Sequence, residues 1–311
     1  MKHPRDGRAI VIAGPTASGK SRLAVALAER CAGVVINADS MQVYRELSIL
    51  TARPTAQEEA RAPHALYGFV SGAEGYSAGR YTVDAARAIA EARSGGRVPI
   101  VVGGTGLYFK ALLQGLSPVP AILPDVRAHW RRQAVLLPAT ELYAILARRD
   151  PVTAARLMPT DPQRIVRALE VLDSTGQPLA EWQRTPGEPV LVERETVRLL
   201  VLPDRRTHAA TIDARFDAML AAGALEEVRR LLALGLSDEL PIMRALGVAP
   251  LAAAIAGKLA LGEAAARAKA QTRQFSKRQG TWYKRNMITW TPLFAQQLQN
   301  LDGIDLSFIG V

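Results

Sequence analysis

The distribution of hydrophobic residues along the chain predicts strands that alternate with helices. Residues 9–13 form a short apolar run, a glycine-rich stretch follows, and residues 20–33 carry apolar side chains at helical spacing. Similar runs of strand length begin at Val34, Val98 and Val197. Alternating strands and helices form parallel sheets covered on both faces, because each crossover helix packs back onto the sheet. We therefore predict an α/β fold with a mostly parallel sheet flanked by helices.

The middle of the chain has a different pattern, bounded by the proline-punctuated stretches 117–124 and 183–189. Helical periods recur between them without a convincing strand, and the nine basic side chains from Arg127 to Arg184 are all arginines. We predict an all-helical insertion, residues 117–196, in a discontinuous core made of residues 1–116 and 197–311. After residue 203 the pattern predicts helices up to about Arg285 and then a less periodic tail.

Composition narrows the class of protein. A chain of 311 residues with 49% hydrophobic content can bury a substantial core. Its apolar runs are far shorter than the roughly 20 residues that cross a bilayer, and the first residues lack the apolar core of a signal peptide. The single cysteine, Cys31, cannot form an internal disulfide. We expect a cytoplasmic protein with no membrane span.

The net charge of +10, from 39 basic and 29 acidic side chains, favours a polyanionic partner such as nucleic acid. GC-rich coding sequence also produces an excess of arginine and alanine without any function, so charge alone leaves this question open. The four histidines, His3, His64, His129 and His208, are scattered without the spacing of metal ligands, and we interpret them as structural.

The stretch "GPTASGKS", residues 14–21, matches the phosphate-loop pattern G-x-x-x-x-G-K-[ST] in its required context between a strand and a helix. Glycines let the backbone N–H groups curl around an anion at the positive end of a helix. Lys20 adds a charge, and Ser21 offers a hydroxyl to Mg²⁺ bridging the phosphate oxygens. The motif predicts a P-loop NTPase-like core whose diphosphate-binding residues are Gly14, Pro15, Thr16, Ala17, Ser18, Gly19, Lys20 and Ser21.

The loop alone does not specify what the phosphates are attached to. Asp39, Ser40 and Gln42 follow the predicted strand 34–37, and Thr105 follows the strand 99–102. Ligands gather at the carboxyl ends of parallel strands, where Asp39 can hold Mg²⁺ through water or act as a general base. Two simpler interpretations stay open: Asp39 caps a short helix, and the "GGTGLY" glycines form a plain turn.

A basic helix is predicted near the C-terminus. Residues 263–286 contain seven Lys or Arg and one acidic residue, with Phe275, Trp282 and Tyr283 interleaved. Arg273 and Lys277 share one face of a helix, and Lys284 lies two turns further on nearly the same side. Cations and aromatic rings suit an RNA backbone with stacked bases. A solvated amphipathic helix with aromatic residues in the core is the alternative.

Five strings of this chain together resemble the tRNA dimethylallyltransferases, in order and in approximate separation: "GPTASGKS", "DSMQVY", "GGTGLYFKALLQGL", "DPQRIVRALE" and "TRQFSKRQGTW". The resemblance covers roughly residues 9–290. It implies transfer of a dimethylallyl group from dimethylallyl diphosphate to N6 of adenosine 37, beside the anticodon of tRNA. The implied partners are the tRNA anticodon stem-loop and dimethylallyl diphosphate, the implied cofactor is Mg²⁺, and we expect a monomer.

The resemblance also implies residue roles. Asp39 would be the general base, Thr105 would hydrogen-bond within the reacting site, and the phosphate loop with Mg²⁺ on Ser21 would stabilise the departing diphosphate. The tRNA contacts of the family match residues at the site, in the insertion and in the C-terminal helix: Asp39, Ser40, Met41, Gln42, Thr105, Arg127, Gln163, Arg164, Ile165, Val166, Arg167, Lys277, Arg278 and Trp282. Of these, Ser40, Met41 and Gln42 would line the adenine pocket. Arg215 is a further candidate to assist the diphosphate.

One segment departs from the family pattern. After "MRALG" the family usually continues with tyrosine, arginine and glutamine, whereas this chain has Val248, Ala249 and Pro250, so a tRNA contact made there is not carried over. Two other functions compete: a P-loop kinase for a small molecule or nucleoside, and an RNA-binding module with a nucleotide switch. A binding module does not need a carboxylate over the phosphate loop. A kinase would carry an arginine-rich lid, which the insertion could imitate.

Overall fold

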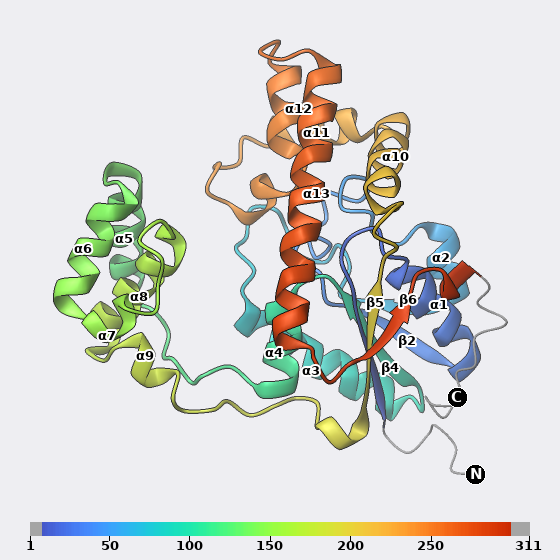
Figure 1. Cartoon of the computed structure of the whole chain (residues 1–311), viewed down its shortest axis with the longest axis horizontal. Coiled ribbons are helices and arrows are strands. Elements are labelled where there is room, and N and C mark those ends of the chain that lie inside the picture. Colours follow the sequence, from blue (N-terminus) through green and yellow to red (C-terminus); the bar gives the residue numbers. More distant parts are fainter. Residues whose placement is uncertain (1–7, 300–311) are drawn as a thin grey trace. The chain divides into compact units, whose positions relative to one another are not determined.

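The computed structural model describes residues 8–299, which divide into two compact units (Figure 1). The first unit is built from both ends of the chain, up to Leu113 and from Val190 onward, and the second is Gln114–Pro189. Both breaks fall near the proline-punctuated stretches of the sequence. Among the described residues, no helix combines the length and apolar character needed to cross a membrane.

The first unit contains a six-stranded sheet in which every neighbouring pair is parallel. Its strands lie in the order β3-β2-β4-β1-β5-β6, with bounds β1 Ala9–Ala13, β2 Gly33–Asn37, β3 His64–Ala65, β4 Val98–Gly103, β5 Thr196–Leu202 and β6 Thr291–Phe294. This confirms the predicted α/β fold with a parallel sheet. Strands β3 and β6 were not predicted, because one has only two residues and the other exposes three of its four.

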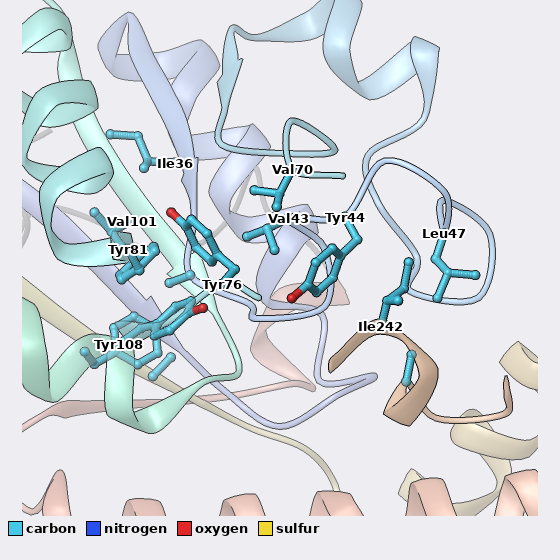
Figure 2. Close-up of a cluster of buried hydrophobic side chains, with 14 of the residues drawn as sticks. Ile36, Val43, Tyr44, Leu47, Val70, Tyr76, Tyr81, Val101, Tyr108 and Ile242 are labelled. Atoms are coloured by element: carbon cyan, nitrogen blue, oxygen red, sulfur yellow. The ribbon is translucent and has the colours of Figure 1, made fainter. Parts of the chain in front are cut away.

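Both faces of the sheet are covered, because its strands direct alternate side chains into two hydrophobic clusters. Ile10 and Ile12 of β1 pack with the apolar face of α1 (Lys20–Cys31). Val11 lies in the second cluster, to which α3 (Ala78–Ser94) and α4 (Gly106–Gln114) contribute. Figure 2 shows part of this second cluster, where side chains of the sheet meet rings from these helices and from the segment after β2.

The other helices of the first unit are α2 (Ala56–Arg61), α10 (His208–Ala221), α11 (Ala224–Ala233), α12 (Val248–Ile255) and α13 (Leu261–Asn286). Helix α13, orange-red in Figure 1, has 26 residues and contacts both α10 and α12. Its end at Asn286 agrees with the helical pattern predicted up to Arg285. Short 3₁₀ turns occur at Glu193–Glu195, Pro241–Arg244 and Gln297–Gln299.

All regular elements of the second unit between residues 115 and 189 are helices. Its helices are α5 (Pro124–Leu136), α6 (Ala139–Arg149), α7 (Pro151–Ala154), α8 (Pro162–Thr175) and α9 (Leu179–Trp182). They enclose a separate core in which Trp130, Leu142 and Leu169 are buried. The Trp130 indole N–H donates a hydrogen bond of 2.8 Å to Asp173, so the polar end of the ring is also satisfied. The predicted all-helical character of the insertion is thus confirmed.

Candidate active site

The phosphate loop connects β1 to α1, as the motif predicted. Gly19 lies immediately before the helix with a φ of 89°, in the left-handed region that favours glycine. The Lys20 ammonium donates to the carbonyl of Pro15 at 3.2 Å, and Ser18 is buried with its hydroxyl against Gly14. A Cβ atom at Gly14 would lie 2.7 Å from that hydroxyl oxygen and 2.9 Å from the backbone carbonyl oxygen of Val201, so the loop requires glycine there. The first backbone amides of α1 are left at the carboxyl edge of the sheet, where an anion can bind.

Asp39 follows β2 at the same edge of the sheet. Its Oδ1 accepts the Met41 N–H at 2.9 Å, which closes a turn around the side chain. The buried Asn37 fixes the Asp39 backbone, accepting its N–H at 2.8 Å and donating to its carbonyl at 3.0 Å. Asp39 therefore caps a turn, and the short helix considered for this position does not form. Its second oxygen, Oδ2, faces the end of β4.

The end of β4 lies directly beside Asp39, because β2 and β4 are neighbours in register. A Cβ at Gly103 would come within 2.1 Å of the Ala38 carbonyl oxygen, and one at Gly104 within 2.5 Å of the Gln279 amide nitrogen of α13. This close approach is the physical reason for the glycine pair. Thr105 follows, and its Oγ1 accepts the Ser40 N–H at 3.0 Å. The segments after β2 and β4 are thus joined through Thr105 and Ser40, the residue that follows Asp39.

Helix α13 fastens the phosphate loop to the end of β4. The buried Gln279 accepts the Thr16 N–H at 3.0 Å and donates to the Gly104 carbonyl at 2.9 Å. The Tyr283 hydroxyl lies 2.9 Å from the Gly104 carbonyl oxygen and 3.2 Å from that of Gly14. Burial, and secondarily the charge of Asp39, raise the pKa of Tyr283, so its hydroxyl keeps the proton that it donates. Thr16, predicted to bind diphosphate, therefore has its N–H occupied by Gln279.

A pocket of about 330 Å³ opens between these elements. Its lining joins residues predicted from the sequence with residues from α10, α13 and the segments at 50–51 and 244–246: Thr16, Ala17, Asp39, Ser40, Met41, Leu50, Thr51, Thr105, Ile212, Arg215, Phe216, Met219, Arg244, Ala245, Leu246, Thr272, Phe275 and Arg278. The lining therefore combines polar and charged side chains with apolar ones, such as Leu50, Ile212 and Phe216, that can receive a hydrocarbon or a base.

The charges at the phosphate loop act on one another. Burial lowers the pKa of Lys20 to about 8; Asp39 opposes this shift and Arg215 adds to it. Burial also lowers the pKa of Arg215, again with Asp39 opposing. Two half-buried cations and one carboxylate leave a net positive charge at the loop. Such a site favours an anion that carries more than one negative charge.

The residues present can accommodate Mg²⁺ only together with a phosphate ligand. Residues 8–299 contain no group of three or more His, Cys, Asp or Glu side chains that could hold a metal ion. Mg²⁺ is commonly bound through one or two protein oxygens plus substrate phosphates, and the exposed Ser21 hydroxyl can supply such an oxygen.

Of the histidines that we interpreted as structural, His208 contacts Ser276 of α13 at 2.8 Å, and His3 lies outside the described residues.

Gln42 does not line the pocket. Its amide nitrogen donates to the carbonyls of Thr51 at 2.9 Å and Ala52 at 2.7 Å, so the side chain braces the following turn. Of the three residues expected around an adenine, Ser40 and Met41 do line the pocket.

Residues of α13 line a separate hollow next to the pocket: Gln274, Lys277, Arg278, Thr281, Trp282, Arg285 and Asn286. The structure therefore places Lys277, Arg278 and Trp282 together, and Arg278 borders both the hollow and the pocket. Two residues of α13 that were expected to face RNA do not line this hollow. Arg273 pairs with Asp213 at 2.5 Å, and Tyr283 is buried and unavailable for stacking.

In the second unit, Arg127, Gln163 and Arg164 are exposed, and Arg167 lies 3.8 Å from Glu170. Burial lowers the pKa of Arg167, while Glu170 opposes the shift. Ile165 and Val166, assigned to tRNA with the rest of this segment, are buried in the core of the unit. Their side chains stabilise α8, so only their polar neighbours present side chains to a partner.

The segment that departs from the family pattern begins α12. Val248 and Pro250 are buried there, and Ala249 exposes only a methyl group. This segment therefore presents no polar side chain to RNA.

Comparisons with known proteins agree with this geometry. The sequence model of the family described as IPP transferase matches residues 42–286, and that described as isopentenyl transferase matches residues 7–64. The chain is 51% identical to a tRNA dimethylallyltransferase of Parvibaculum lavamentivorans over 303 residues, covering 97% of this chain and 96% of the relative.

Two solved structures are also similar. A eukaryotic dimethylallyltransferase described as acting on tRNA has a TM-score of 0.81 and 29% identity, over 97% of this chain and 77% of that one. A tRNA isopentenylpyrophosphate transferase from Bacillus halodurans has a TM-score of 0.66 and 31% identity, over 93% and 90% of the two chains. These relatives favour neither the kinase nor the binding module. The chain belongs to the IPP transferase family, the family of the tRNA dimethylallyltransferases.

Proposed function

We propose that this protein transfers a dimethylallyl group from dimethylallyl diphosphate to N6 of adenosine 37 in tRNA, with release of diphosphate. The observation that carries the proposal is that Asp39 and Thr105 line one pocket together with phosphate-loop residues and with apolar side chains. A phosphate loop alone would serve a nucleotide equally well. An allylic donor also requires space for a hydrocarbon and a proton acceptor for the incoming amine.

The phosphate loop would hold the leaving group. Negative charge develops on the diphosphate as the C–O bond breaks, and the backbone amides of Ala17 and of Gly19 to Ser21, together with Lys20, face that charge. The Ser18 N–H already donates to the Pro15 carbonyl at 3.3 Å. Arg215 lines the adjoining pocket and supplies a second cation. Mg²⁺, bound to the diphosphate and to Ser21, would neutralise further charge on the phosphate oxygens.

Asp39 would accept the proton lost by the attacking amine. Adenine N6 is barely basic, so a proton acceptor within hydrogen-bond reach lowers the barrier to attack on the allylic carbon. The hydrogen bond from the Met41 N–H to Oδ1 fixes the carboxylate and leaves Oδ2 for the proton. Thr105 holds the Ser40 backbone beside it. The proton, the prenyl group and the diphosphate are thereby all accounted for.

The tRNA would approach along α13. Lys277, Arg278 and Trp282 lie in one hollow, and Arg278 connects it with the pocket that contains Asp39. A base from a single-stranded loop can leave its stack at a cost of a few kcal/mol and enter such a pocket. Arg127, Gln163, Arg164 and Arg167 are the candidate contacts of the helical unit. We further propose that the protein acts as a monomer, in the cytoplasm, on its tRNA substrate.

The proposed contact of Lys277 with RNA can be tested through salt dependence. Lys277→Ala should weaken binding of an unmodified anticodon stem-loop and make the slope of log K against log salt shallower by about 0.7, the value for one phosphate of a single strand. Filter binding over a range of salt concentrations measures both. Lys258→Ala removes an exposed lysine beyond the other end of α13 and should leave the slope unchanged. An unaltered slope in Lys277→Ala would remove this residue from the interface.

The depressed pKa of Lys20 predicts proton uptake when a diphosphate ester binds. The free site holds Lys20 with a pKa of about 8, so above pH 8 most molecules must take up a proton to form the ion pair. Donor affinity should therefore fall as the pH rises from 7 to 9. Calorimetry at pH 8.5 in buffers of different ionisation enthalpy measures the uptake, which Lys20→Met should abolish. Equal affinities at pH 7 and 9 would contradict the prediction.

The choice of acceptor tests the proposed function itself. Two anticodon stem-loops that differ only in adenosine or guanosine at position 37 are incubated with labelled dimethylallyl diphosphate and Mg²⁺. Label should enter only the adenosine loop, because guanine presents a carbonyl oxygen where adenine presents N6. Equal labelling of both loops, or of neither, would refute the proposal.

A further inference from the structure

The first backbone amides of the turn formed by residues 48–52 are bound by a buried carboxylate that is distant in the sequence. Glu227 of α11 is 2% exposed. Its Oε1 accepts the N–H groups of Ser48 at 2.7 Å and Ile49 at 2.9 Å, and its Oε2 accepts that of Leu50 at 2.8 Å. The Ser48 hydroxyl donates to Oε1 as well, at 3.0 Å. Three successive backbone amides of the turn thus depend on one side chain.

The other end of the turn is closed by its own backbone. The Arg53 N–H donates to the Ser48 carbonyl and the Ala52 N–H to the Ile49 carbonyl, both at 2.9 Å, in the pattern of a Schellman motif. Ala52 has a φ of 51°, a left-handed conformation that is strained for a residue with a Cβ. The Gln42 amide then holds the carbonyls of Thr51 and Ala52. A strained turn held from both ends has one defined shape.

This turn forms one side of the pocket that contains Asp39. Leu50 and Thr51 line that pocket with Ser40 and Met41. The segment before the turn is anchored in the core, where Figure 2 shows Val43, Tyr44 and Leu47 within the hydrophobic cluster. The phosphate loop is held by different contacts, those of Gln279 of α13 with Thr16 and Gly104. The 48–52 turn and the phosphate loop therefore have separate supports.

We propose that Glu227 is a positioning residue for the acceptor base. It holds the 48–52 turn so that Leu50 and Thr51 form the surface against which the incoming base packs. Glu227 does not touch the substrate. Its carboxylate accepts charge-assisted hydrogen bonds from amides that would otherwise be left unsatisfied in a buried place. The inference rests on the proposed function, because it assigns this side of the pocket to the base.

Glu227→Gln tests the inference with little change of volume. The glutamine keeps one acceptor oxygen but turns an NH₂ group toward at least one backbone N–H, so the turn must shift. We expect the KM for the anticodon stem-loop to rise about tenfold, while the KM for dimethylallyl diphosphate changes less than about twofold. The control is Glu226→Gln on the same helix, because Glu226 is exposed and pairs with Arg229. It should match the natural chain in both KM values.

An effect on the acceptor KM alone distinguishes a positioning role of Glu227 from a purely structural one. An unchanged acceptor KM in folded Glu227→Gln, or an equal rise of both KM values, would overturn the inference. If circular dichroism shows that this variant does not fold, Leu50→Ala decides, since it alters the same surface without touching the carboxylate. It should raise the acceptor KM alone, and an unchanged value would overturn the inference. Failure of the natural chain to transfer any dimethylallyl group would instead refute the proposed function, and this inference with it.

Discussion

Asp39→Asn should lower kcat by roughly 10²–10⁴-fold, the usual contribution of a general base, while the affinity for tRNA changes less than about twofold. Asparagine has nearly the shape of aspartate and retains an oxygen that can accept the Met41 N–H, which in the native protein bonds to Oδ1 at 2.9 Å. The turn after β2 should therefore persist. Only the capacity to take a proton from adenine N6 is lost. Single-turnover kinetics with saturating donor and tRNA, together with equilibrium binding of tRNA, measure the two effects separately.

Asp217→Asn is the matched control for this substitution. Asp217 is exposed on α10, pairs with Lys269 of α13 and does not line the pocket. Its replacement should leave turnover unchanged. If Asp39→Asn weakened tRNA binding as much as it lowered turnover, Asp39 would act as a cap or contact residue and the assignment as general base would fail.

Lys20→Met should lower kcat/KM for dimethylallyl diphosphate by about 10²–10³-fold, the cost of removing one preorganised donor from a developing anion. Methionine fills a similar volume without charge, and within residues 8–299 the Lys20 ammonium donates one hydrogen bond, to the Pro15 carbonyl. The affinity for tRNA should be unchanged, because the proposed RNA contacts lie on α13 and in the helical unit. Steady-state kinetics with varied donor at saturating tRNA measure the effect.

Lys110→Met removes an exposed lysine of α4 in the same unit and serves as the control. Its kinetic constants should equal those of the natural chain. Donor constants that stayed within about twofold of the natural values in Lys20→Met would mean that the diphosphate binds elsewhere, since an ion pair of this kind contributes well over that amount.

The parts of the site that follow directly from local sequence were predictable. The phosphate loop has fixed spacing between a strand and a helix, and Asp39 and Thr105 each follow a run of buried residues. Because parallel strands end at one edge, these two residues had to lie near the loop once the strand order placed β4 between β2 and β1. The structure brings them together through Ser40.

The residues that support the site were not predictable from the sequence, because their partners are distant along the chain. The hydrogen bond from Thr16 to Gln279 joins residues separated by 263 positions, and the bond from Ser48 to Glu227 spans 179. Periodicity identifies α13 as a helix, and Gln279 and Tyr283 at i and i+4 as one face of it. It does not say where that face docks. For this reason we expected Tyr283 to face RNA from the sequence, but the residue is buried, with 1% of its surface exposed.

The structure also shows that not every residue of a short motif is exposed to a partner. Residues 163–167 were carried over as a block, but on a helix two of these five positions face the core. Gln42 was expected at the adenine, and its amide instead bonds to the turn that lines the pocket. Both cases arise because a motif records which residues a site requires and does not separate contact from support.

The central claim is that the phosphate loop holds the diphosphate of an allylic donor, and the mass of the tRNA product tests it most directly. Unmodified tRNA is incubated with the protein, Mg²⁺ and either dimethylallyl diphosphate or ATP, then digested and weighed by mass spectrometry while released phosphates are measured. We predict one dimethylallyl unit on adenosine 37 and one diphosphate released per adduct, with no reaction from ATP. Hydrolysis of ATP without any adduct from dimethylallyl diphosphate would contradict the account.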